Sequence, residues 1–151
     1  MSGTASMLVG AGLLVVVAGL LAMAEAAFTT FSKARADALV VDGRRGAERV
    51  RRLVEDRAPA LNTALLLRLA AEFTAVVLVA VLCVGWFDAD WAAVLVAAGS
   101  MLVVSFVVIG VAPRTLGRQH AERVALVMAG PLLTVTRVLG PLPRLLILLG
   151  N

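Results

Sequence analysis

Residues 61–87 read LNTALLLRLAAEFTAVVLVAVLCVGWF, an apolar stretch that contains two charged side chains, Arg68 and Glu72. A helix crosses a bilayer with roughly 20 apolar residues, so this stretch is long enough to span it. A charged side chain near the middle of the membrane costs about 2.5–3.5 kcal/mol on insertion scales. Because Arg68 and Glu72 are four residues apart, they share one helical face. We expect another part of the protein to compensate the charges on that face.

The composition of the whole chain is that of a membrane protein. Of its 151 residues, 61% are hydrophobic, and the mean hydropathy is +0.98. A soluble domain is typically about 45–50% apolar. The net charge of +4 does not indicate nucleic-acid binding, because the basic residues cluster beside apolar stretches, where they set the orientation of membrane helices. We therefore predict an all-α integral membrane protein that lies in a lipid bilayer and binds no nucleic acid.

The sequence contains none of the motifs that mark the common enzyme classes. It has no hydrolase triad, no phosphate-binding loop and no dinucleotide fingerprint. Its one histidine, His120, has no second histidine near it, and its one cysteine, Cys83, lies in an apolar run. We expect no enzymatic activity and no resident cofactor.

Hydropathy predicts three transmembrane helices, at about residues 7–28, 61–87 and 92–112. The first of them could instead be a signal peptide cleaved after Ala24, but no positive charge precedes it. Basic residues follow the first and third spans, whereas the loop Asp88–Asp90 is acidic and flanked by tryptophans. This pattern predicts a multi-pass plasma-membrane protein with its amino terminus outside and its carboxyl terminus in the cytoplasm.

The most charged stretch, residues 33–57, is predicted to form two short helices along the cytoplasmic surface, with a turn at Asp42–Gly43. One face of the second helix is apolar and could rest on lipid or on a partner, or the helix could be an ordinary solvated one. The apolar positions are Ala47, Val50, Leu53 and Val54.

The carboxyl-terminal stretch, residues 124–149, is apolar but contains prolines and arginines. A fourth span would place Arg137 near mid-membrane, so we predict interfacial or re-entrant helices there. The third span is predicted to end with a helix break at Pro113 and Arg114.

The first span supplies a partner for the charges of the second. If that span ends near Ser32, Glu25 lies about seven residues, or ~10 Å, from the cytoplasmic edge, at a depth similar to that of Arg68. Glu25, Arg68 and Glu72 would then form either a structural network of intramembrane charges or a path for a cation or proton along the two glutamates. The fixed charge of Arg68 disfavours a bare cation site. In the same span, Gly12, Gly19 and Ala26 form a seam of small residues that predicts close contact with another helix.

Three segments resemble the transmembrane domain of the CNNM/CorC (hemolysin-like) family. They are LLAMAEAAF at residues 20–28, Arg45–Gly46–Ala47 in the basic stretch, and APRTLGR at residues 112–118. The resemblance covers nearly the whole chain, residues 1–151, as a single CNNM-like transmembrane domain. It implies three spans with juxtamembrane helices, a homodimer or a related membrane subunit as partner, and transport of divalent cations, Mg²⁺ or Co²⁺.

The chain departs from this family at the positions expected to supply oxygen ligands. Ala22 stands where the family has serine, and Ile109–Gly110 where it has a Gly-Glu pair. Arg68 falls in the region of a Gly-Asn turn, and Arg114 replaces a lysine. Glu25 is the only side chain that matches a family acid, so we assign no metal ligand with certainty and expect Mg²⁺ only if the family function is retained. The alternative is a non-transporting membrane scaffold or partner subunit.

The resemblance also implies cytoplasmic CBS domains, and we expect none within residues 1–151. We expect the chain to be a shortened form or a divergent relative of the family.

The predicted topology can be tested by cysteine labelling from the two sides of the membrane. With Cys83 replaced by alanine, single cysteines at Gly43 and Ala89 should react with an impermeant reagent from opposite sides, because the first lies in the basic stretch and the second in the acidic loop. Labelling of both positions from the same side would contradict the three-span topology.

Overall fold

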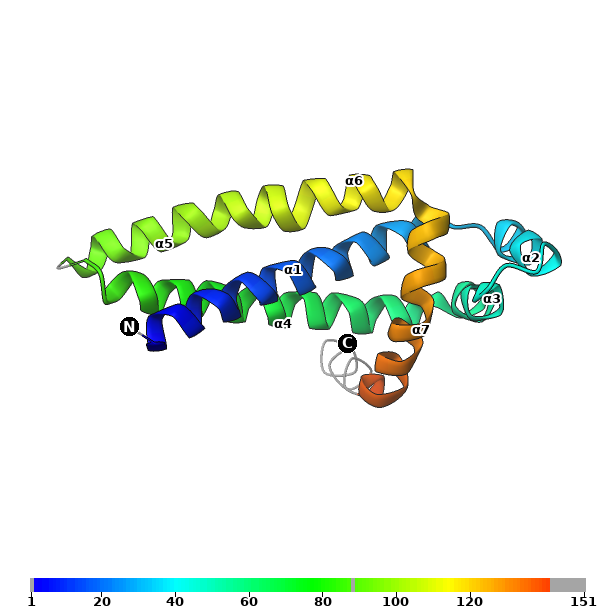
Figure 1. Ribbon diagram of the computed structural model, residues 1–151, viewed down its shortest axis with the longest axis horizontal. Coiled ribbons are helices and arrows are strands. Elements are labelled where there is room, and N and C mark those ends of the chain that lie inside the picture. Colours follow the sequence, from blue (N-terminus) through cyan, green and yellow to red (C-terminus); the bar gives the residue numbers. More distant parts are fainter. Residues whose placement is uncertain (1, 88, 142–151) are drawn as a thin grey trace, which may run out of the picture.

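The structure is a computed structural model that describes residues 2–87 and 89–141 (Figure 1). In this part of the chain, three long helical rods lie side by side, and each is long and apolar enough to cross a membrane. The predicted all-α membrane fold is thereby confirmed. The rods are α1 (Ser2–Thr30), α4 (Arg57–Val84), and a third made of α5 (Asp90–Val104), the π-helix η1 (Ser105–Val111) and α6 (Ala112–Gln119).

The bounds of α4 follow from local sequence signals. The helix begins at Arg57, ahead of the predicted start at residue 61, and Pro59 falls in its first turn, where a missing N–H group breaks no helical hydrogen bond. The helix ends at Val84 and is followed by Gly85. The apolar run itself is therefore helical, and the predicted span is shifted by a few residues.

The third rod does not break at Pro113, where we predicted its end. The helix continues through Pro113 and Arg114 as far as Gln119. The π-helix η1 ends immediately before, so Pro113 lies in the first turn of α6. The hydrogen-bonding pattern changes from π to α at this point, so the missing N–H group of Pro113 falls at a change of register and not within a regular α-helical turn.

Two short helices follow α1 at one end of the rods, α2 (Lys33–Val41) and α3 (Ala47–Glu55). The turn between them contains two glycines with left-handed backbone, Gly43 with φ 65° and Gly46 with φ 88°. Glycine adopts this conformation without steric cost. Because a cysteine at Gly43 would be strained, the neighbouring exposed Arg45 is the better position for labelling.

The apolar face of α3 is buried within the protein, so the interpretation that it rests on lipid or on a partner was wrong. Val50 and Leu53 are fully buried, in one cluster with Phe28 and Phe31 at the end of α1 and Leu132 of α7 (Ala121–Leu139). The face is covered because α7 returns across the ends of the long helices (Figure 1). The described part of the predicted pair at 124–149 is this one helix, which includes Pro131, and residues 142–149 lie outside the described residues.

The seam of small residues on α1 contacts the third rod along part of its length. A Cβ atom on Gly19 would lie 3.2 Å from the carbonyl oxygen of Val108, and Ala26 is buried beside Gly117. Gly12 is exposed, and a Cβ there would meet no atom within 4 Å. The closest approach is at Gly117, where a Cβ would overlap the backbone carbonyl of Met23.

This close approach predicts a difference between two glycine substitutions. Gly117→Ala should destabilise the protein by about 1–3 kcal/mol, because the added methyl group must push α6 away from α1. Gly99→Ala in α5 adds the same group to open space and should be neutral or slightly stabilising, since alanine favours helix. Melting temperatures of the two variants in one detergent provide the measurement, and equal values would contradict the described packing of α1 on α6.

Candidate functional site

Three charged side chains meet between the first two spans. The Nε atom of Arg68 lies 3.4 Å from Oε2 of Glu25, and its Nη1 atom lies 3.8 Å from Oε2 of Glu72. The side chains of Glu25, Arg68 and Glu72 are only 16%, 13% and 20% exposed. The structure thus brings together the three residues that depth and spacing had singled out.

Small residues on both helices place these charges opposite each other. Ala18 and Ala22 of α1 pack in one buried cluster with Ala71 of α4 and Ile109 of η1. Short side chains allow the backbones of membrane helices to approach closely. Glu25 and Arg68 each lie one helical turn from this contact on the same side, so their side chains meet across the interface.

The carboxylate of Glu25 is only partly satisfied. Its Oε2 atom faces Arg68, while Oε1 is buried and has no hydrogen-bond partner among the described residues. The Thr29 hydroxyl, one turn further along α1, donates to the backbone carbonyl of Glu25 and not to its carboxylate. One oxygen of Glu25 therefore remains available to water or to a ligand.

A cavity of about 280 Å³, which we call the vestibule, adjoins Glu25 between α1, α4 and α6. Its polar lining residues are Glu25, Thr29, Asn62, Arg114 and Arg118. Two guanidinium groups face one carboxylate here, so the vestibule is more positive than negative. Such a cavity disfavours a bare cation and suits water or an anion.

Of the polar lining residues, the sequence singled out Glu25 as an intramembrane charge and Arg114 as part of a helix break, whereas Thr29, Asn62 and Arg118 were not predicted as site residues. A signal was present, because Glu25 and Thr29, like Arg114 and Arg118, are spaced by four residues and therefore share a helical face. Pro113 does not line the vestibule and packs close to Gly19.

The positions expected to bind a metal ion in this family offer few oxygen atoms. Ala22 is fully buried in the packing of α1, and Gly110 lies in η1 without a side chain. Within residues 2–87 and 89–141, no three side chains of the types His, Cys, Asp and Glu lie close enough to hold a metal ion together. Mg²⁺ requires oxygen ligands in near-octahedral array, at about 2.0–2.1 Å. The described side chains do not provide that array around Glu25.

Comparison with known proteins agrees with the resemblance seen in the sequence. A family model described as the Cyclin M transmembrane N-terminal domain (CNNM) matches residues 9–151. Two similar relatives are the UPF0053 protein Mb2387c of Mycobacterium bovis and the UPF0053 protein Rv2366c of Mycobacterium tuberculosis. Each is 45% identical over 144 residues, which make up 95% of this chain and 33% of the relative. The chain therefore spans about a third of the length of these curated relatives.

The ion pair predicts a strong coupling between its partners. Glu25→Gln and Arg68→Gln should each destabilise the protein by up to about 3–5 kcal/mol, because each removes the nearest opposite charge from a largely buried group, although Arg68 keeps its longer contact with Glu72 after Glu25→Gln. The double variant should recover part of that loss, with a coupling energy of about 0.5–3 kcal/mol measured by unfolding in detergent micelles.

Glu72→Gln serves as the matched control for this cycle. Glu72 contacts Arg68 at a longer distance than Glu25 does, and its side chain is more exposed. The loss of stability should therefore be smaller for Glu72→Gln than for Glu25→Gln. Single-variant losses that simply add in the double variant would show that Glu25 and Arg68 do not interact.

Proposed function

This chain belongs to the CNNM family, the family of the Cyclin M transmembrane N-terminal domain, and from that premise we propose that it acts as a non-transporting membrane scaffold or partner subunit. A single observation carries the proposal: the guanidinium group of Arg68 lies against Glu25, the one acid that matches the family pattern. In the proposed orientation, α2 and α3 lie on the cytoplasmic side of the plasma membrane and the amino terminus lies outside.

Electrostatics explains why this arrangement opposes a dehydrated divalent cation at Glu25. Two like unit charges ~4 Å apart repel by about 4 kcal/mol at an effective dielectric constant of 20, and a divalent ion doubles that figure. Arginine cannot relieve the repulsion by losing its proton. A Mg²⁺ ion bound directly to Glu25 would therefore have to displace Arg68, which would keep only its longer contact with Glu72.

The proposed partner is a second copy of the chain or a related membrane subunit. Gly12 lies on an exposed part of α1, where the space around its Cα is open. Interfaces between membrane helices are enriched in such small residues. The outward half of α1 is accordingly the surface on which we place the partner.

A second candidate function is the divalent-cation transport that the family resemblance implies, for Mg²⁺ or Co²⁺. It is favoured by the free Oε1 atom of Glu25 and by the oxygen atoms of Thr29 and Asn62 in the vestibule. These groups suit an ion that keeps its water shell, because water molecules would then separate the ion from Arg68 and Arg114.

Stability in the presence of Mg²⁺ distinguishes the two functions. Millimolar MgCl₂ should not raise the melting temperature of the wild-type chain above that in NaCl of equal ionic strength, because a ligand stabilises only a protein that binds it. Mg²⁺ flux into proteoliposomes should equal that into empty liposomes. A Mg²⁺-dependent rise in melting temperature that Glu25→Gln abolishes would establish the transporter instead.

A further inference from the structure

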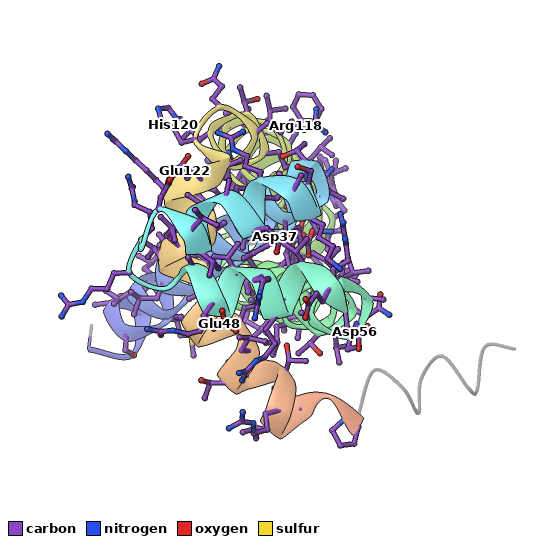
Figure 2. All side chains as sticks on the ribbon, turned by 90° about the vertical axis from the view of Figure 1, so that its right-hand side faces the viewer. Asp37, Glu48, Asp56, Arg118, His120 and Glu122 are labelled. Atoms are coloured by element: carbon purple, nitrogen blue, oxygen red, sulfur yellow. The ribbon has the colours of Figure 1, made fainter. Side chains whose placement is uncertain are left out.

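A second cavity, of about 460 Å³, lies at the end of the molecule where α6 meets α7. We call it the arginine cavity, because four arginines from separate parts of the chain line it. Figure 2 shows Arg118, His120 and Glu122 gathered there, over α6 and the start of α7. The four arginines are Arg35 of α2, Arg44 of the following turn, Arg118 of α6 and Arg123 of α7.

Positive charge in the arginine cavity exceeds negative charge. Its one carboxylate, Glu122, is shared between Arg35, at 3.5 Å, and Arg44, at 3.4 Å. Arg118 and Arg123 have no ion-pair partner among the residues that the structure describes. Four guanidinium groups that line one cavity with a single carboxylate repel one another, and an additional anion in the cavity would relieve that repulsion.

The position of the arginine cavity indicates where the anion comes from. Arg118 lies in the last turn of the third rod, and it also lines the vestibule within the bundle. The cavity is therefore at the level where a membrane-spanning helix leaves the bilayer and where lipid phosphates lie. The charge pattern assigns this end to the cytoplasm, whose membrane leaflet carries anionic lipids.

We propose that the arginine cavity binds the phosphate group of an anionic lipid in the cytoplasmic leaflet. Guanidinium groups match phosphate oxygens through paired, charge-assisted hydrogen bonds, and basic pockets between membrane helices are a recurrent form of lipid headgroup site. Glu122 holds Arg35 and Arg44 in place from two different segments, and Arg118 and Arg123 supply the charge that the lipid neutralises. The site shares Arg118 with the vestibule but does not include Glu25, and it does not rest on the function proposed above.

Native mass spectrometry of the purified full chain tests the proposal with short-chain phosphatidylglycerol and with phosphatidylcholine of the same acyl length. The wild-type protein should bind phosphatidylglycerol at least about tenfold more tightly than phosphatidylcholine, because only phosphatidylglycerol carries a net negative charge. Arg118→Gln with Arg123→Gln should weaken its binding by roughly thirtyfold, at about a fivefold effect for each arginine. Arg123→Gln alone, which leaves the vestibule unchanged, should weaken it roughly fivefold.

The matched control is Lys33→Gln with Arg45→Gln, which removes the same charge at exposed positions outside the arginine cavity. The affinity of this double variant for phosphatidylglycerol should lie within about threefold of the wild-type affinity. If both double variants lost the same affinity for phosphatidylglycerol at unchanged melting temperatures, the lipid would be attracted by surface charge in general, and the proposed site would be wrong. Displacement of phosphatidylglycerol by an equal concentration of inorganic phosphate would overturn the assignment to a lipid.

Discussion

The buried ion pair between Arg68 and Glu25 constrains how the first two spans are arranged. A charge left without a partner inside a membrane is costly, so the two helices must meet at matched depth and with matched rotation. A shift of either helix by one residue turns its side chains by about 100° and would carry its charge toward lipid. The pair therefore specifies the register of α1 on α4, whatever its net contribution to stability.

Small side chains make that register possible, and they also shape the chemistry of the site. Ala22 is fully buried where α1 packs near α4, and Gly117 lets α6 approach the backbone of Met23. The residues that allow close packing carry no oxygen in their side chains. The interior thus gains tight helix contacts at positions that offer no side-chain oxygen atom to a cation.

The helices beyond the spans form a cap that is stabilised differently. The apolar face of α3 is buried against the end of α1 and against α7, so this cap has a core of its own. Burial of that face leaves the basic residues of the amphipathic helix exposed. It also brings the α2 side of the cap against the start of α7, where Arg35 and Arg44 contact Glu122. Basic residues from separate segments are thereby gathered around one defined cavity.

The sequence alone specified most of the architecture, because hydrophobicity and charge along a chain act locally. The three apolar runs, the turn at Asp42–Gly43 and the two short basic helices can all be read without tertiary information. The meeting of Glu25 with Arg68 was also predictable, since helical rise converts residue number into depth in a membrane. The family followed from short motifs and was confirmed by comparison.

Only the tertiary structure determined which elements pack against each face of a helix. Whether Pro113 breaks a helix depends on η1 before it, and a π-helical turn arises from hydrogen bonding that no residue pattern in this stretch revealed. Whether the face of α3 meets lipid or protein depends on the path of α7, more than 60 residues later in the chain. The vestibule and the arginine cavity each combine side chains from three or more segments. Periodicity describes one helix at a time, and only the packing of several helices brings such residues to one place.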